Sequence, residues 1–151
     1  MIKVLFVCHG NICRSPIAEF VLKDMVKKHH LENQFHIESA ATSYEEIGNP
    51  VYPPARRVLA THGSSCDGKR ARKLVKKDFE DFDYLIAMEE YNLRNIRREF
   101  GANLTERVSL LLDYTDRPGD IDDPWYTGKF DLTYDEIELG CKGFLKSLGM
   151  I

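Results

Sequence analysis

Cys8 and Arg14, near the start of the chain, are two residues whose side chains could act on the same bound group. A guanidinium presents a planar pair of donors that matches two oxygens of a phosphate, which a lysine cannot do. A cysteine beside such a cation and a helix N-terminus is stabilised as a thiolate, which is a nucleophile. The turn between them contains Gly10 and Asn11 and is suited to pointing backbone N–H groups at one anion. The spacing therefore indicates a site at which a thiolate attacks a bound oxyanion.

The segments on both sides of this turn must hold it in place. Residues 4–7 form a continuous apolar run, which is typical of a strand buried on both faces of a parallel sheet. Ser15 is predicted to be the N-cap of the following helix, because Pro16 comes next and proline is favoured at the first helical position. A strand, a short turn and a helix therefore surround the two reactive residues.

The rest of the chain repeats this alternation. The patterns predict strands at 35–40, 82–88 and 107–112, helices at 55–62, 89–100 and 134–148, and irregular segments at 42–54, 64–77 and 113–131. Strands that alternate with helices predict one α/β domain over residues 1–151, with a four-stranded parallel sheet and helices on both faces in three layers. Ligands of such sheets bind beyond the carboxyl ends of the strands. The cysteine turn and the long loop at 113–131 can therefore meet at one edge of the sheet.

The composition narrows the classes of partner. A net charge of −3 over 151 residues gives no reason to expect a nucleic acid or a membrane as partner. No apolar run approaches the length that spans a bilayer, and the first residues enter a strand rather than a signal peptide. The four cysteines have the spacing of neither a disulfide framework nor a zinc site. Reduced thiols at Cys8 and Cys13 suit a reducing compartment, so we expect a cytoplasmic protein.

The residues of the cysteine turn also match a known family. The run Cys8-His9-Gly10-Asn11-Ile12-Cys13-Arg14-Ser15-Pro16, directly after an N-terminal strand, resembles the phosphate loop of the low-molecular-weight protein tyrosine phosphatases. The resemblance covers nearly the whole chain. It implies hydrolysis of phosphotyrosine and small aryl phosphates through a cysteinyl-phosphate, with residues 8–15 binding the phosphate. It also implies a phosphotyrosine-bearing protein or peptide as partner, inorganic phosphate as product, no cofactor or metal, and a monomer.

The general acid is expected in the long loop. Cleavage of a phosphate ester needs a proton for the leaving oxygen. The segment from Ile121 to Tyr126 contains Asp122-Asp123-Pro124 and resembles the family segment in which the aspartate before proline is the acid. That match places the acid at Asp123, and it makes Trp125 and Tyr126 the aromatic walls of a cleft for a phenyl phosphate. A surface Asp-Pro turn with aromatic residues packed in the core is the alternative interpretation.

Other residues would support the phosphate loop. Asn11 resembles a family asparagine that braces the loop, and Ser15 resembles a hydroxyl that hydrogen-bonds the nucleophile. Ser39 resembles a serine beneath the loop, although a serine that only ends a strand remains open. Cys13 resembles a cysteine that traps an oxidised nucleophile as a disulfide, with a small buried filler as the alternative. His9 is expected to line the mouth of the cleft, either in contact with the substrate or as a solvated imidazole.

The chain departs from the family pattern at three positions outside the nucleophile, the arginine and the acid. Trp125 stands where many relatives have tyrosine, and Lys69 where relatives often have a supporting histidine. Glu89 follows Met88 where relatives have aspartate. These differences concern the supporting contacts and the choice of peptide.

Three alternatives compete with this interpretation. An arsenate reductase of the same fold needs further cysteines after the third strand, and residues 87–90 contain none. Phosphoarginine phosphatases of this class resemble the loop but have threonine where Ile12 stands. A phosphoprotein-binding module would require neither Cys8 nor Asp123. The sequence therefore favours a phosphotyrosine phosphatase.

Overall fold

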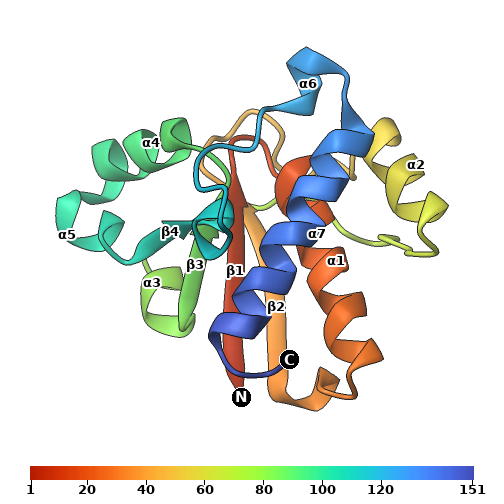
Figure 1. Cartoon of the computed structure of the whole chain (residues 1–151). Helices are drawn as coiled ribbons and strands as arrows, with labels where there is room; N and C mark the ends of the chain where they lie inside the picture. The colour runs from red at the N-terminus through yellow and green to blue at the C-terminus, as the bar shows by residue number, and fades with distance from the viewer.

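Four parallel strands form one sheet in the computed structural model, which describes residues 1–151 (Figure 1). They are β1 (Ile2–Cys8), β2 (Phe35–Ala41), β3 (Tyr84–Ala87) and β4 (Val108–Leu110), in the spatial order β2-β1-β3-β4. Each neighbouring pair is parallel, and Cys8 at the end of β1 is paired in register with Ala41 at the end of β2. The predicted single α/β domain with a four-stranded parallel sheet is confirmed.

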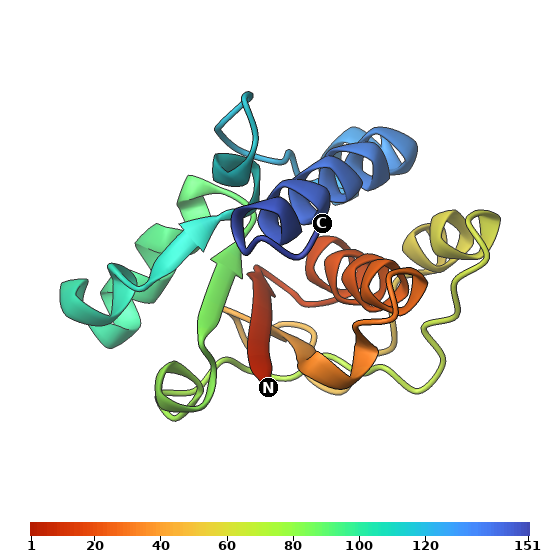
Figure 2. The same cartoon turned by 60° about the horizontal axis from the view of Figure 1, so that its bottom comes forward.

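Helices cover both faces of this sheet (Figures 1 and 2). The α-helices are α1 (Arg14–Lys28), α2 (Pro53–Thr61), α3 (Asp78–Asp81), α4 (Glu90–Phe100), α5 (Ala102–Thr105), α6 (Pro124–Thr127) and α7 (Phe130–Ser147), and two 3-10 turns are η1 (Glu32–Gln34) and η2 (Leu111–Tyr114). Helices α1, α2 and α7 lie on one face, and α3, α4 and α5 lie on the other. No helix combines the length and the apolar character that crossing a membrane requires.

The side chains of β1 divide the core into two parts. Val4 and Phe6 belong to the larger apolar cluster with α1 and α7, whereas Leu5 and Val7 belong to the smaller cluster with α3 and α4. All four are 0% exposed, which explains why the strand is continuously apolar instead of alternating. This rigid central strand ends at Cys8.

Several boundaries differ from the sequence-based prediction. The fourth strand is only three residues long, because the chain turns into η2 at Leu111. The loop predicted over 113–131 contains the single turn of α6 and the start of α7. The short helices α3 and α5 were not predicted, since four residues are too few to display a helical period. Residues 64–77 contain neither helix nor strand, as predicted.

Candidate active site

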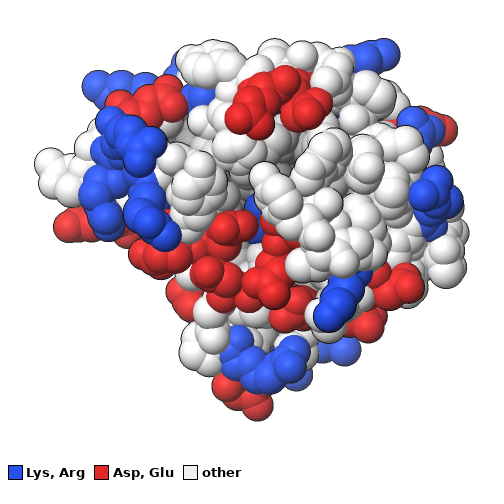
Figure 3. All heavy atoms as spheres, turned by 90° about the horizontal axis from the view of Figure 1, so that it is seen from above, with Lys and Arg blue, Asp and Glu red and all other residues white.

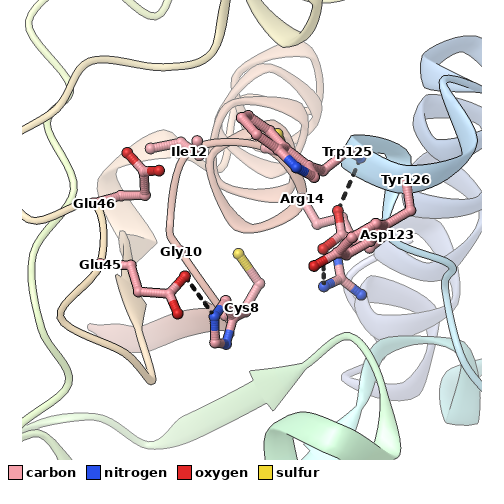
Figure 4. A pocket seen from close by; sticks show the side chains of 11 residues that line it. Cys8, Gly10, Ile12, Arg14, Glu45, Glu46, Asp123, Trp125 and Tyr126 are labelled. Carbon is pink, nitrogen blue, oxygen red and sulfur yellow. Dashed lines mark hydrogen bonds and ion pairs between the residues drawn. The ribbon is translucent and has the colours of Figure 1, made fainter.

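The turn after β1 forms one side of a cleft at the carboxyl edge of the sheet. Its lining residues come from the turn, from the loop after β2 and from the start of α6: Cys8, His9, Gly10, Ile12, Cys13, Arg14, Glu45, Glu46, Asp123, Trp125 and Tyr126. Figure 4 shows the Cys8 sulfur facing the middle of this space, with Arg14 and Asp123 on one side and Glu45 and Glu46 on the other. The long loop and the cysteine turn thus meet at one edge, as expected from the topology.

The backbone of the turn is shaped to receive an anion. Asn11 has a φ of 59°, in the left-handed region that asparagine tolerates better than most residues. Its backbone N–H donates to the Cys8 sulfur at 3.3 Å. The N–H groups of Gly10, Ile12 and Cys13 donate to no backbone acceptor, so they remain free for an oxyanion.

Ser15 supports Cys8 instead of capping a helix, so the N-cap prediction was wrong. The helix begins at Arg14, with Cys13 at the N-cap position and no side-chain cap. The Ser15 hydroxyl lies 3.0 Å from the Cys8 sulfur and accepts a hydrogen bond from Asn11 Nδ2 at 2.7 Å. Asn11 Nδ2 also donates to Ser39 Oγ at 2.9 Å. The three predicted supporting residues thus form one hydrogen-bonded group beneath the nucleophile.

Arg14 is 1% exposed and is held by acceptors from two distant segments. One terminal nitrogen pairs with the Glu89 carboxylate and donates to the Ile121 carbonyl at 2.8 Å, and the other lies 3.4 Å from Asp123 Oδ2. Burial acts to lower the Arg14 pKa, but Cys8, Asp123 and Glu89 outweigh it and raise the pKa above its usual value. The guanidinium is therefore a fixed cation beside the Cys8 sulfur.

Asp123 lies opposite Cys8 at the start of α6. It is the N-cap residue of this single turn, and its Oδ1 accepts a hydrogen bond from the Trp125 backbone N–H at 3.0 Å. Its Oδ2 faces Arg14, and the side chain is 24% exposed, so it remains accessible to a bound group. Asp122 lines a neighbouring groove together with Glu89 and is absent from the lining of the main cleft.

The two aromatic residues after Pro124 border the cleft opening. Trp125 is 50% exposed and lies with its ring centroid 4.7 Å from that of Tyr52, whereas Tyr126 is 84% exposed. Neither is part of the apolar core. The alternative of core packing is therefore wrong for both side chains.

Cys13 and His9 also line the cleft. Burial, reinforced by Cys8 and Asp123, raises the pKa of the Cys13 thiol well above its usual range. All four cysteines are free thiols. His9 Nε2 lies 3.0 Å from Glu45 Oε2, which links the cysteine turn to the loop after β2. No three side chains of the kind that bind metals are grouped together.

Two cleft residues, and a third residue that packs against the cleft wall, were not predicted from the sequence. Glu45 and Glu46 line the cleft, and Tyr52 packs behind Trp125, all from the segment between β2 and α2. Only the position of this segment in the sequence could have indicated these residues, since it follows the carboxyl end of β2, the strand next to β1.

The comparisons with known proteins agree with this geometry. Residues 3–150 match the family model described as low molecular weight phosphotyrosine protein phosphatase. The chain is 41% identical over 150 residues to the low molecular weight protein-tyrosine-phosphatase YfkJ of Bacillus subtilis, covering 98% of this chain and 96% of that protein. The crystal structure of YfkJ superposes with a TM-score of 0.94 at 40% identity, over 99% of this chain and 95% of that one. A Drosophila arginine phosphatase has a TM-score of 0.87 at 32% identity, over 97% and 98% of the two chains. This chain belongs to the low molecular weight phosphotyrosine protein phosphatase family.

Proposed function

We propose that the protein is a tyrosine phosphatase that hydrolyses phosphotyrosine, and small aryl phosphates, through a cysteinyl-phosphate. One observation carries the proposal: a cysteine sulfur, a buried guanidinium and an accessible carboxyl group line a single cleft. These are the nucleophile, the anion-binding group and the acid that cleavage of a phosphate ester requires.

In the first step the Cys8 thiolate attacks phosphorus on the side opposite the leaving oxygen. The S–P bond forms as the bond from phosphorus to the tyrosine oxygen breaks, and Asp123 gives its proton to that oxygen. Arg14 and the free N–H groups of the turn hold the equatorial oxygens, where negative charge is spread. The Asn11 N–H and the Ser15 hydroxyl, both in contact with sulfur, stabilise the thiolate before attack.

In the second step water attacks the cysteinyl-phosphate. Asp123, now ionised, accepts a proton from the water, and the S–P bond breaks to release inorganic phosphate. The sulfur leaves as a thiolate, and the Asn11 N–H and the Ser15 hydroxyl stabilise it as they did before attack. The cycle restores Cys8 and protonated Asp123 without a cofactor.

Hydrolysis of p-nitrophenyl phosphate and of a phosphotyrosine peptide, measured across pH, tests this mechanism. We expect Cys8→Ser to be inactive. We expect Asp123→Ala to lose about 10²–10⁴-fold in kcat on the peptide, whose leaving group needs a proton, and less on p-nitrophenyl phosphate. Asp122→Ala is the matched control and should retain most activity. Phosphate binding by a wild-type protein that does not turn over would instead indicate a binding module.

Phosphoarginine is the competing substrate, because one structural neighbour is described as an arginine phosphatase. Ile12 lines the cleft with an aliphatic side chain, which favours an aromatic ring over a guanidinium group. We expect phosphotyrosine to be preferred when both phosphates are compared on one peptide backbone. Arsenate reduction would need a thiol relay, but Cys66 and Cys141 lie outside the cleft lining.

We also propose a cytoplasmic location and a monomer that acts on phosphoproteins rather than on nucleic acids or membranes. Four free thiols suit a reducing compartment, and the net charge of −3 offers no attraction to anionic polymers or lipids. Size-exclusion chromatography with light scattering would check the monomer.

A further inference from the structure

Glu19 is a buried carboxylate for which the phosphatase mechanism has no role. It lies on α1 and its side chain is only 5% exposed. Oε1 accepts a hydrogen bond from the Ser39 hydroxyl at 2.6 Å and lies 3.3 Å from Lys69 Nζ. Oε2 accepts one from Lys23 Nζ at 2.7 Å. A charge this deeply buried needs such partners, and one of them leads to the active site.

The hydrogen bonds from Glu19 to Cys8 have a fixed direction. A carboxylate only accepts, so Ser39 donates its proton to Glu19 and accepts from Asn11 Nδ2. The orientation of the Asn11 side-chain amide is fixed, because its Oδ1 accepts a hydrogen bond from the Arg72 backbone N–H at 3.1 Å. Ser15 accepts from the same Nδ2, which leaves its own proton free for the Cys8 sulfur.

Lys69 holds the far end of this series. Its side chain is 12% exposed, and Nζ donates to the Ser39 carbonyl at 2.9 Å while pairing with Glu19. Burial lowers the pKa of Lys69, and Glu19 acts in the opposite direction. The other charged groups near it, Arg72 and Glu38, pair with each other at 3.3 Å. Lys69 therefore holds both the Glu19 carboxylate and the backbone of Ser39, and Ser39 links Glu19 to the phosphate loop.

Lys23 provides a natural comparison. It contacts the other oxygen of the same carboxylate, but its side chain is 43% exposed and no contact joins it to Ser39. Both lysines compensate the charge of Glu19, but only Lys69 also contacts Ser39, the residue that links Glu19 to Asn11.

We propose that Lys69 is a positioning residue for the nucleophile: through Glu19 and Ser39 it sets Asn11 so that Ser15 donates to the Cys8 sulfur. The inference rests on the proposed function of Cys8. It assigns to Lys69 an effect on catalysis across four intervening side chains, without any contact with the substrate.

Lys69→Met and Lys23→Met, assayed with p-nitrophenyl phosphate, test the proposal. We expect Lys69→Met to lower kcat about fivefold with little change in KM, because the phosphate contacts remain. The acidic limb of its kcat/KM profile should move to higher pH, since the thiolate loses an oriented donor. Lys23→Met should keep the wild-type profile. Thermal unfolding of both variants separates these effects from loss of fold.

Ser39→Ala completes the design, because it interrupts the series without removing a charge. It should show the same loss and the same shift, and adding Lys69→Met to it should cause no further change in kcat. The proposal is overturned if folded Lys69→Met and Lys23→Met have the same profile, or if Ser39→Ala behaves as wild type. An inactive wild-type protein would instead refute the proposed function itself.

Discussion

Arg14 illustrates how a charge can be kept inside this protein. At 1% exposure an unpaired guanidinium would be strongly destabilising, yet Glu89, Asp123 and the Ile121 carbonyl surround it. Glu89 also caps α4, since its side chain accepts from the backbone of Asn92. Glu89 thus both pairs with Arg14 and caps α4.

Glu89→Gln should weaken the hold on Arg14 while preserving the cap. The amide oxygen can still accept from the backbone, but the guanidinium loses a charged partner, a bond worth about 1.5–3 kcal/mol. We expect kcat/KM for p-nitrophenyl phosphate to fall about tenfold, which corresponds to 1.4 kcal/mol. Glu90→Gln, an exposed neighbour, is the control. Equal activity of the two variants would contradict a role for Glu89 in orienting Arg14.

The thiols should differ sharply in their reaction with iodoacetamide at pH 7. Burial is the largest cause that raises the pKa values of Cys13, Cys66 and Cys141, so these thiols stay protonated at neutral pH. Only a thiolate is alkylated rapidly. We expect peptide mapping to find the label on Cys8, with activity lost in parallel and inorganic phosphate protecting it. Labelling of Cys13 before Cys8 would contradict the assignment of the nucleophile.

At the scale of elements, the position of α7 depends on its close approach to η2. A Cβ at Gly143 would overlap the backbone oxygen of Tyr114, whereas a Cβ at Gly140 would meet mainly the side chain of Leu111. Backbone cannot move aside as a side chain can. Glycine is therefore required where the two elements cross.

Gly143→Ala should destabilise the protein although alanine is the better helix former. Alanine gains about 1 kcal/mol of helix propensity, but overpacking against backbone costs about 3 kcal/mol, so we expect a net loss of about 2 kcal/mol. Gly140→Ala should lose less, because Leu111 can change its rotamer. Urea unfolding of both variants measures the difference. Equal stability of Gly143→Ala and wild type would refute the packing argument.

The same scale explains what the sequence could predict. The apolar run of β1 and the period of α7 were visible because each buries a repeating set of side chains. The sequence predicts a loop where the short helix α6 lies, since a single helical turn displays no period. The sequence predicts a cap at Ser15, because the same hydroxyl chemistry serves caps and buried hydrogen bonds. The approach of Lys69 to Glu19 depends on tertiary packing, which no local pattern contains.

At the scale of the whole molecule, charge is unevenly distributed around the cleft. We call Glu45, Glu46, Glu89, Asp122 and Asp123 the acidic rim: they are the acids that line the cleft and the adjoining groove. Arg14 is the one Lys or Arg in these linings. Figure 3, which views this end from above, shows acidic side chains near the middle of the face and basic ones mainly at its margins. A substrate therefore approaches through a negative potential.

Phosphotyrosine peptides with lysine or arginine beside the phosphotyrosine should be hydrolysed faster than otherwise identical peptides with acidic neighbours. Exposed charges steer a charged ligand through long-range attraction, so we expect about a tenfold difference in kcat/KM at low ionic strength. The difference should shrink in about 1 M salt, where the Debye length is about 3 Å.

Glu45→Gln with Glu46→Gln should reduce the preference for basic peptides. Glu32→Gln with Glu106→Gln makes the same change in net charge before β2 and β4, at the opposite edge of the sheet, and should leave the preference intact. If both double variants reduce the preference equally, the net charge of the protein determines the preference and the acidic rim does not. If the wild type hydrolyses basic and acidic peptides equally, the acidic rim plays no part in selecting substrates.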